Sequence, residues 1–429
     1  MAVSLIRDAE VENTIRAYAT PLFSAAGLKA SDVKIFIVKD NTLNAFVAGG
    51  QKLFINTGLI LNADSANQVI GVIAHETGHI AGGHLSRVHD ALSKNSAASI
   101  LAFVLGGAAA LATGRGDVGA AVAAGGQSIA LRNFLAYSRV QESSADHAAM
   151  KYLDATETSA EGLLQFMEKL GDQELLSPAQ QDPYVRTHPL TRERIDALQH
   201  HVKTSSSSNT PEPPRIAAMH ARMKAKLFAF LNPIGRTLRR YKESDDSVPS
   251  RYARAIGRYR EGKIDPAVKL IDSLIAEEPS NPYFHELRGQ MLFESGRLHE
   301  ALKSYGEAAK LLPSSDLIRR DLARAQMAFE QPALTDAAIV NLEAALAVDK
   351  EQSFTWRLLA TAYGRKGDHG RSSIALAEEA LLQDKPDIAE FHAGRAIGIF
   401  PQGSREWLQA EDIRLAAKEM ASRKRRDEN

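Results

Sequence analysis

Residues 66–87 read ANQVIGVIAHETGHIAGGHLSR, and this stretch decides how the first half of the chain folds. Its apolar residues recur at the spacing of one helical face, which predicts a single helix; they are Val69, Ile70, Ile73 and Ile80. His75 and His79 lie four residues apart on this helix, so their imidazoles are one turn from each other and can chelate one metal ion.

Glu76 follows the first histidine and projects to the side of the helix. A carboxylate there can reach a water on the fourth position of a bound zinc ion and deprotonate it without being a ligand itself. Zinc lowers the pKa of such a water to about 7 and polarises the scissile carbonyl. By chance, H-E-x-x-H is expected on the order of a few hundredths of a time in a chain with 13 histidines among 429 residues. The motif therefore predicts a zinc peptidase site rather than an exposed, charged helix face.

A catalytic zinc ion needs a third protein ligand, and the absence of cysteine leaves histidine, aspartate and glutamate as candidates. Glu142 and Asp146 lie four residues apart on a second predicted helix. Glu142 can therefore bind zinc while Asp146 accepts a hydrogen bond from the other nitrogen of a ligand histidine. Two imidazoles and one carboxylate leave the centre with about one net positive charge, which keeps it electrophilic. An exposed acidic pair is the alternative interpretation.

Two further histidines follow the motif. His84 and His89 lie at offsets from His79 that do not favour the zinc face. A metzincin would carry its third histidine where this chain has Leu85. The spacing therefore argues against a metzincin.

The stretches before the helix predict a small β-sheet. A helical pattern over residues 9–26 precedes a strand-like run from Val33 and two short strands turned at Gly49-Gly50. The balance of 52 Lys and Arg against 52 Asp and Glu gives no sign of a nucleic-acid partner. The start lacks the basic and apolar regions of a secretory signal, which an exported protein also lacks once its signal is removed.

Residues 96–131 are rich in alanine and glycine, with apolar runs at 97–112 and 118–124. A membrane-spanning helix needs about 20 apolar residues, so both runs are short for a span. We weigh a buried helical hairpin first, a loop that contacts a membrane surface or a partner second, and a true span third.

The length of the chain predicts two or more domains. Residues 204–214, TSSSSNTPEPP, have the composition of a linker between a domain at 1–203 and a second at 215–429. The second domain shows a 34-residue period, which is the tetratricopeptide period: Gly262, Ala267, Ile271 and Pro279 recur as Gly296, Ala301, Tyr305 and Pro313. The predicted repeats cover 248–281, 282–315, 316–352 and 353–387, with a degenerate cap at 388–420.

Three motifs, AHETGH from Ala74, ESSAD from Glu142 and THPLTRERI from Thr187, together resemble the zinc metallopeptidase family that includes HtpX and the CAAX prenyl endopeptidases. With the appended repeats, the chain is most similar to the periplasmic, BepA-like branch. The resemblance implies an α+β fold: a mainly helical, zincin-like domain of gluzincin type with a small sheet, followed by an all-α tetratricopeptide solenoid. It also implies one Zn²⁺ per chain, held by His75, His79 and Glu142, with Glu76 as the base and Asp146 behind the ligands.

The same resemblance adds His188, which precedes a proline. This residue would either steady the oxyanion or occupy the open zinc position as a gate, whereas a surface loop histidine is the plain alternative. A substrate would lie as an extended strand beside Asn44 to Ala48 and add to the edge of the sheet.

The expected function is that of an endopeptidase that cleaves misfolded or stalled envelope proteins in the periplasm. Its repeats would bind substrate or the outer-membrane assembly machinery, and residues 97–124 are the candidate for a peripheral membrane contact if they do not form a buried hairpin. The rival interpretation is a chaperone or scaffold for outer-membrane protein assembly with a mostly closed zinc site.

Overall fold

The computed structural model of the protein describes residues 4–84, 128–171 and 183–427, and only the backbone of residues 128–138, 186 and 427. Most of the Ala/Gly-rich segment, with the membrane contact expected at 97–124, lies outside the described residues. The chain divides into two compact units, Met1–Leu231 (unit 1) and Asn232–Asn429 (unit 2), and each is described by itself.

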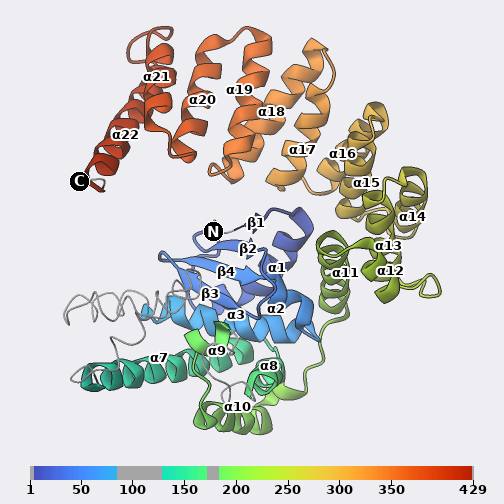
Figure 1. Ribbon diagram of the computed structural model, residues 1–429, viewed down its shortest axis with the longest axis vertical. Coiled ribbons are helices and arrows are strands. Elements are labelled where there is room, and N and C mark those ends of the chain that lie inside the picture. The colour runs from blue at the N-terminus through green and yellow to red at the C-terminus, as the bar shows by residue number, and fades with distance from the viewer. Residues whose placement is uncertain (1–3, 85–127, 172–182, 428–429) are drawn as a thin grey trace. The chain divides into compact units, whose positions relative to one another are not determined.

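Unit 1 contains a four-stranded mixed sheet with the strand order β1-β2-β4-β3. Its strands are β1 (Leu5–Ile6), β2 (Lys34–Val38), β3 (Ala45–Ala48) and β4 (Lys52–Asn56). β2 and β4 run parallel, whereas β1 and β3 are antiparallel to their neighbours. Gly49, Gly50 and Gln51 connect β3 to β4, and the two glycines have φ values of +55° and +90°, which few other residues adopt. β3 is therefore an edge strand of the described sheet (Figure 1).

The two faces of the sheet differ because side chains alternate along each strand. One face carries buried aliphatic residues that share a core with α1 (Ala9–Ala25) and α3 (Ala66–Ala81). These residues are Ile37, Ala45, Leu53 and Ile55. The other face carries three half-buried phenylalanines, one on each of β2, β4 and β3.

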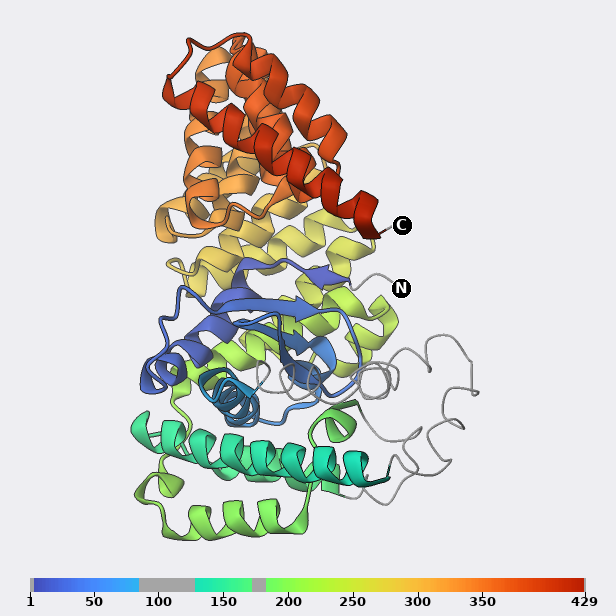
Figure 2. The ribbon, with the colours of Figure 1, turned by 90° about the vertical axis from the view of Figure 1, so that its left-hand side faces the viewer.

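Helices form successive layers below the aliphatic face, in the order α3, α7 (Ser128–Ala155) and α10 (Arg192–Thr204) (Figure 2). The close approach of α3 and α7 depends on Gly78, because a Cβ at this position would lie 2.8 Å from the backbone oxygen of Ala145. Unit 1 also contains α2 (Thr57–Asn62), α8 (Glu161–Gly171) and α9 (Pro183–Thr187).

The boundary between the units differs from the predicted linker at 204–214. Part of that segment forms a 3₁₀ turn, Ser206–Asn209, that is tied to unit 1 by a 2.9 Å hydrogen bond from the Ser159 hydroxyl to the Ser208 carbonyl. The next helix, α11 (Pro214–Leu231), buries Met223 and Leu227 in the core of unit 1. Unit 2 thus begins at Asn232 instead of residue 215.

Unit 2 is entirely helical over its described residues, and its helices pack as consecutive antiparallel pairs (Figure 1). The pairs follow α12 (Ile234–Arg240) and are α13 (Val248–Arg260) with α14 (Ile264–Glu277), α15 (Pro282–Glu294) with α16 (Leu298–Leu311), α17 (Asp316–Met327) with α18 (Pro332–Val348), α19 (Ser353–Lys366) with α20 (His369–Leu382), and α21 (Pro386–Ile397) with α22 (Arg405–Asp427). The predicted fold class is confirmed: unit 1 is α+β and unit 2 is a helical repeat. Within the described ranges, no helix is long and apolar enough to cross a membrane.

Candidate metal centre

Four side chains from three segments converge inside unit 1. His75 and His79 come from α3, Glu142 from α7, and His188 from the turn after α9. Their ligand atoms all lie within 4.8 Å of one another, and all four residues are buried. The facing Nε2 atoms of the α3 histidines are 3.1 Å apart, and each lies 3.3 Å from an oxygen of Glu142. This set of donors could hold one metal ion.

Asp146 lies one turn after Glu142 and orients the first histidine. Its Oδ1 is 2.8 Å from His75 Nδ1, so Nε2 is left to face the other ligand atoms. Arg194, from α10, holds this carboxylate in turn: its Nε donates to Oδ2 at 2.6 Å and its Nη2 to Oδ1 at 2.9 Å. Such an outer partner fixes the tautomer and the ring orientation of a ligand histidine.

His84 contacts the second histidine on the side away from the other donors, as Asp146 does for the first. Its Nδ1 lies 2.9 Å from His79 Nδ1, and the residue is 4% exposed. The offset of five residues keeps it off the ligand face, as the sequence predicted, but it places the ring against the far side of His79.

The buried charges shift the pKa values of the ligand groups in different directions. Burial lowers the pKa of His79 to about 3, so this imidazole is neutral. Burial alone would also lower the pKa of His75, but its contacts with Asp146 and Glu142 raise it to about 10. Burial alone would raise the pKa of Glu142, yet His188 and the two other histidines hold it well below its ordinary value. His75 would have to lose its proton to act as a metal ligand.

Glu76 lies beside the convergent donors and is 1% exposed. Burial raises the pKa of its carboxyl above the ordinary value. His188 Nε2 is 3.4 Å from its Oε1, and neither oxygen has a hydrogen bond from any residue that the structure describes. Burying a carboxylate without hydrogen bonds costs free energy. The position of Glu76 therefore fits a carboxylate whose partner is a bound water molecule or substrate. Nitrogen and oxygen donors around one point, with an unused carboxylate next to them, suit a catalytic metal ion.

His188 itself lies among the donors, 3.2 Å from Glu142 Oε2 and 3.4 Å from His75 Nε2 through its Nδ1. The ring of Tyr184, one turn earlier, packs against it with 4.6 Å between centroids. Arg194 donates to the Pro189 carbonyl at 2.7 Å and so holds the turn that carries this histidine.

All the site residues named from the sequence thus meet in one place. Sequence reasoning did not single out Arg194 or Tyr184, and it set His84 off the zinc face without predicting its contact with His79. Arg194 stands within the quoted THPLTRERI motif, so a signal for it was present. His84 and Tyr184 carry no such signal because their roles depend on packing between separate segments.

Comparisons with known proteins agree with this geometry. The model of peptidase family M48 matches residues 6–202. The β-barrel assembly-enhancing protease of Escherichia coli O157:H7 is 23% identical over 402 residues, which cover 90% of this chain and 78% of the relative. The protein of the same name from Yersinia pestis is also 23% identical, over 89% of this chain and 78% of its own length. A putative β-barrel assembly-enhancing protease from Vibrio cholerae is 28% identical over 59% of this chain and 54% of that protein.

Among solved structures, two of MamA resemble parts of the chain at 20% and 18% sequence identity. They cover 40% and 38% of this chain, 96% and 98% of their own, with TM-scores of 0.30 and 0.34. At such scores the likeness carries no inference. The conclusion rests on the match over residues 6–202 and on the convergent donors within it. The first unit, most of which matches the model of peptidase family M48, is a metal-dependent endopeptidase domain.

Proposed function

We propose that the protein is a zinc-dependent endopeptidase in which His75, His79 and Glu142 hold one Zn²⁺. The observation that carries the proposal is the convergence of these three donors, within hydrogen-bonding distance of one another, beside the unbonded carboxylate of Glu76. Two imidazoles and one carboxylate, without thiolates, are a common donor set of catalytic zinc. When bound, zinc would lower the pKa of a water molecule and polarise the scissile carbonyl.

Glu76 acts as the base. Its carboxylate takes a proton from the attacking water and gives it to the leaving amine, and a raised pKa suits a group that must do both near neutral pH. Asp146 and Arg194 keep the His75 ring in position during these steps. His188 either donates a hydrogen bond to the developing oxyanion or closes the site by binding beside the three ligands.

The substrate is proposed to bind as an extended strand along β3, from Asn44 to Ala48, because this edge belongs to a sheet against which α3 packs. Backbone pairing tolerates many sequences, which suits misfolded or stalled chains. The relatives are named for enhancing β-barrel assembly. We extend that role to this chain as cleavage of envelope proteins in the periplasm.

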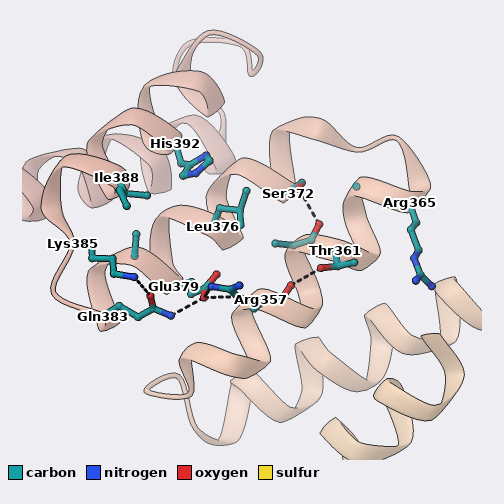
Figure 3. A pocket seen from close by; sticks show the side chains of 13 residues that line it. Arg357, Thr361, Arg365, Ser372, Leu376, Glu379, Gln383, Lys385, Ile388 and His392 are labelled. Atoms are coloured by element: carbon teal, nitrogen blue, oxygen red, sulfur yellow. Dashed lines mark hydrogen bonds and ion pairs between the residues drawn. The ribbon is translucent and has the colours of Figure 1, made fainter. Parts of the chain in front are cut away.

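Unit 2 is proposed to bind a protein, either the substrate or the outer-membrane assembly machinery. Between α19, α20 and α21 it has a pocket of about 650 Å³ with charged and apolar walls (Figure 3). Arg357, Lys385, Leu376 and Ile388 line it, and the buried Glu379 accepts from Arg357 Nε at 2.7 Å. Such mixed walls suit a peptide better than a small apolar ligand.

Glu76→Gln tests the proposed base. We expect it to reduce cleavage of unfolded casein by a factor of about 10² to 10⁴, while the protein still binds one zinc ion, as measured by elemental analysis. Glu168→Gln, on the exposed surface of α8, serves as the control and should cleave normally. Full activity after removal of the metal by a chelator would contradict the proposal.

His188→Ala separates the two roles of this histidine. Higher casein cleavage than in the wild type would support a gate, whereas loss of turnover with zinc retained would support stabilisation of the oxyanion. If neither rate nor zinc content changes, both roles are excluded.

A further inference from the structure

The outer face of the sheet carries a row of three phenylalanines that the proposed chemistry does not use. Phe36 on β2 is paired with Phe54 on β4, and Phe54 is paired with Phe46 on β3. The rings are stacked, with 4.9 Å between the first two centroids, 5.0 Å between the second two, and interplanar angles of 17° and 8°. We call Phe36, Phe54 and Phe46 the aromatic row. Each ring is half-buried, so part of its surface stays accessible.

The row ends at the edge where a substrate strand would add. The Asn56 N–H bonds to the Asn44 carbonyl at 2.9 Å. In an antiparallel ladder the bonded pairs alternate, so the backbone groups of Ala45 and Val47 point away from β4. A strand added at this edge would bond to these two residues, and the residue between its bonded positions would lie directly opposite Phe46.

The spacing of the row matches that of a sheet. Neighbouring strands lie about 4.8 Å apart, and the rings already repeat at that distance. Residues directly opposite each other across two strands have Cβ atoms about 4.5–5.5 Å apart. An aromatic side chain on the added strand can therefore stack on Phe46 as the fourth ring. Its two neighbours in sequence point to the other face, toward the side of the sheet that α3 covers.

We propose that Phe46 is a specificity-determining residue that selects substrates with an aromatic side chain on the face of the bound strand opposite α3. The ligand is thus an extended segment in which aromatic and other residues alternate, as in an amphipathic β-strand, rather than any unfolded chain. This inference rests on the proposed binding of substrate along β3. It adds that the edge strand selects substrates by their side chains as well as by backbone hydrogen bonds.

Peptide binding tests the proposal in the full-length, zinc-loaded protein carrying Glu76→Gln, which keeps the peptides intact. Three fluorescein-labelled peptides alternate threonine with phenylalanine, leucine or serine, between terminal lysines. In fluorescence anisotropy, we expect the phenylalanine peptide to bind about fivefold more tightly than the serine peptide, with the leucine peptide between them. Adding Phe46→Ala should abolish most of this difference and change the affinity for the serine peptide less than about twofold.

Two further variants complete the test. Phe46→Leu keeps most of the apolar volume, so it should fold normally and remove the advantage of phenylalanine over leucine. Phe391→Ala removes a ring that is 62% exposed on α21 in unit 2 and should leave the order of affinities unchanged. The inference is overturned if no peptide binds, if Phe46→Ala weakens all three equally, or if it preserves the preference.

Failure of the proposed function would look different. In that case the zinc-loaded wild type would cleave the phenylalanine peptide no faster than the Glu76→Gln protein, whatever the binding affinities are. Normal cleavage without a preference that depends on Phe46 would overturn the specificity alone.

Discussion

His75 is held by a chain of contacts that reaches well beyond the candidate ligands. Asp146 accepts its Nδ1 hydrogen bond, Arg194 binds both oxygens of that carboxylate, and the same guanidinium bonds to the Pro189 carbonyl. Burial raises the pKa of Asp146, but its bonds to Arg194 and His75 prevail and hold the pKa below its ordinary value. One arginine therefore supports both a candidate metal ligand on α3 and the turn that carries His188.

Asp146→Asn tests this support. The amide keeps the shape of the carboxylate but loses its charge, so the His75 ring is no longer fixed in one tautomer. We expect zinc affinity to fall by about 10- to 100-fold, as measured by competition with a chromophoric chelator.

The control for this change lies on the same helix. Asp154 also accepts from a histidine, His201, at 3.3 Å, but away from the site. Asp154→Asn should leave zinc affinity unchanged. Equal losses in the two variants would mean that Asp146 acts on general stability instead of on the ligand.

At this scale the sequence predicted which residues meet but not all of their neighbours. The i, i+4 spacing predicted that His75 and His79 share one helix face and that Glu142 and Asp146 share another. The two faces meet because α3 packs against α7. Arg194 was not singled out because its partner lies 48 residues earlier, on another element.

Among the elements, α11 shows how composition misled the placement of the boundary. The serine- and proline-rich segment before it does resemble a linker. Two ion pairs join α11 to the start of α1: Lys226 Nζ lies 2.8 Å from Oδ2 of Asp8, the residue before α1, and Arg222 Nε lies 3.1 Å from Glu10 Oε1. Sequence analysis does not predict such pairs, because neither residue of a pair differs from an ordinary surface charge until the fold brings the two together.

The same helix predicts a pH-dependent stability. His220 is 4% exposed and lies near Tyr18 of α1. Its burial and, to a smaller extent, the charge of the nearby Lys224 lower its pKa to about 4. An unfolded histidine has a pKa of about 6.5, so the unfolded state binds the proton first as pH falls. The contribution of His220 to the free energy of unfolding is fully present above pH 6.5. It falls by about 1.4 kcal/mol per pH unit between pH 6.5 and pH 4.

Urea unfolding of the wild type and of His220→Gln between pH 4 and 7 measures this effect. The difference in unfolding free energy between the two proteins should narrow as pH falls, because glutamine does not titrate. His200→Gln, at an exposed position of α10, should run parallel to the wild type. A constant difference for His220→Gln would show that this histidine titrates with the same pKa in the folded and unfolded states.

For the whole molecule, the division after Leu231 means that each unit holds its own core. Unit 2 could be foreseen from its 34-residue period, since each of the four predicted repeats contains two helices of the structure. A period identifies one element after another without any long-range contact. Unit 1 has no period, and its mixed sheet joins β2 to β4 across the intervening hairpin strand, which sequence reasoning did not predict.

Two fragments test the boundary. Residues 1–231 should fold and unfold cooperatively, whereas residues 1–213 lack α11 and expose the core that Met223 and Leu227 cover. Each of these side chains contributes about 2 kcal/mol when buried, so circular dichroism should show a lower melting temperature for the shorter fragment. Equal melting temperatures would place the boundary at the predicted linker after all.

The dispersal of the metal centre along the chain has a consequence for biosynthesis. His75 and His188 are 113 residues apart in sequence, and Arg194 follows still later. A ribosome therefore releases the two α3 histidines long before the residues that complete and brace the centre. A nascent chain cannot cleave neighbouring polypeptides until its first unit has been synthesised, because the centre is incomplete before then. The order of translation therefore delays the onset of proteolysis.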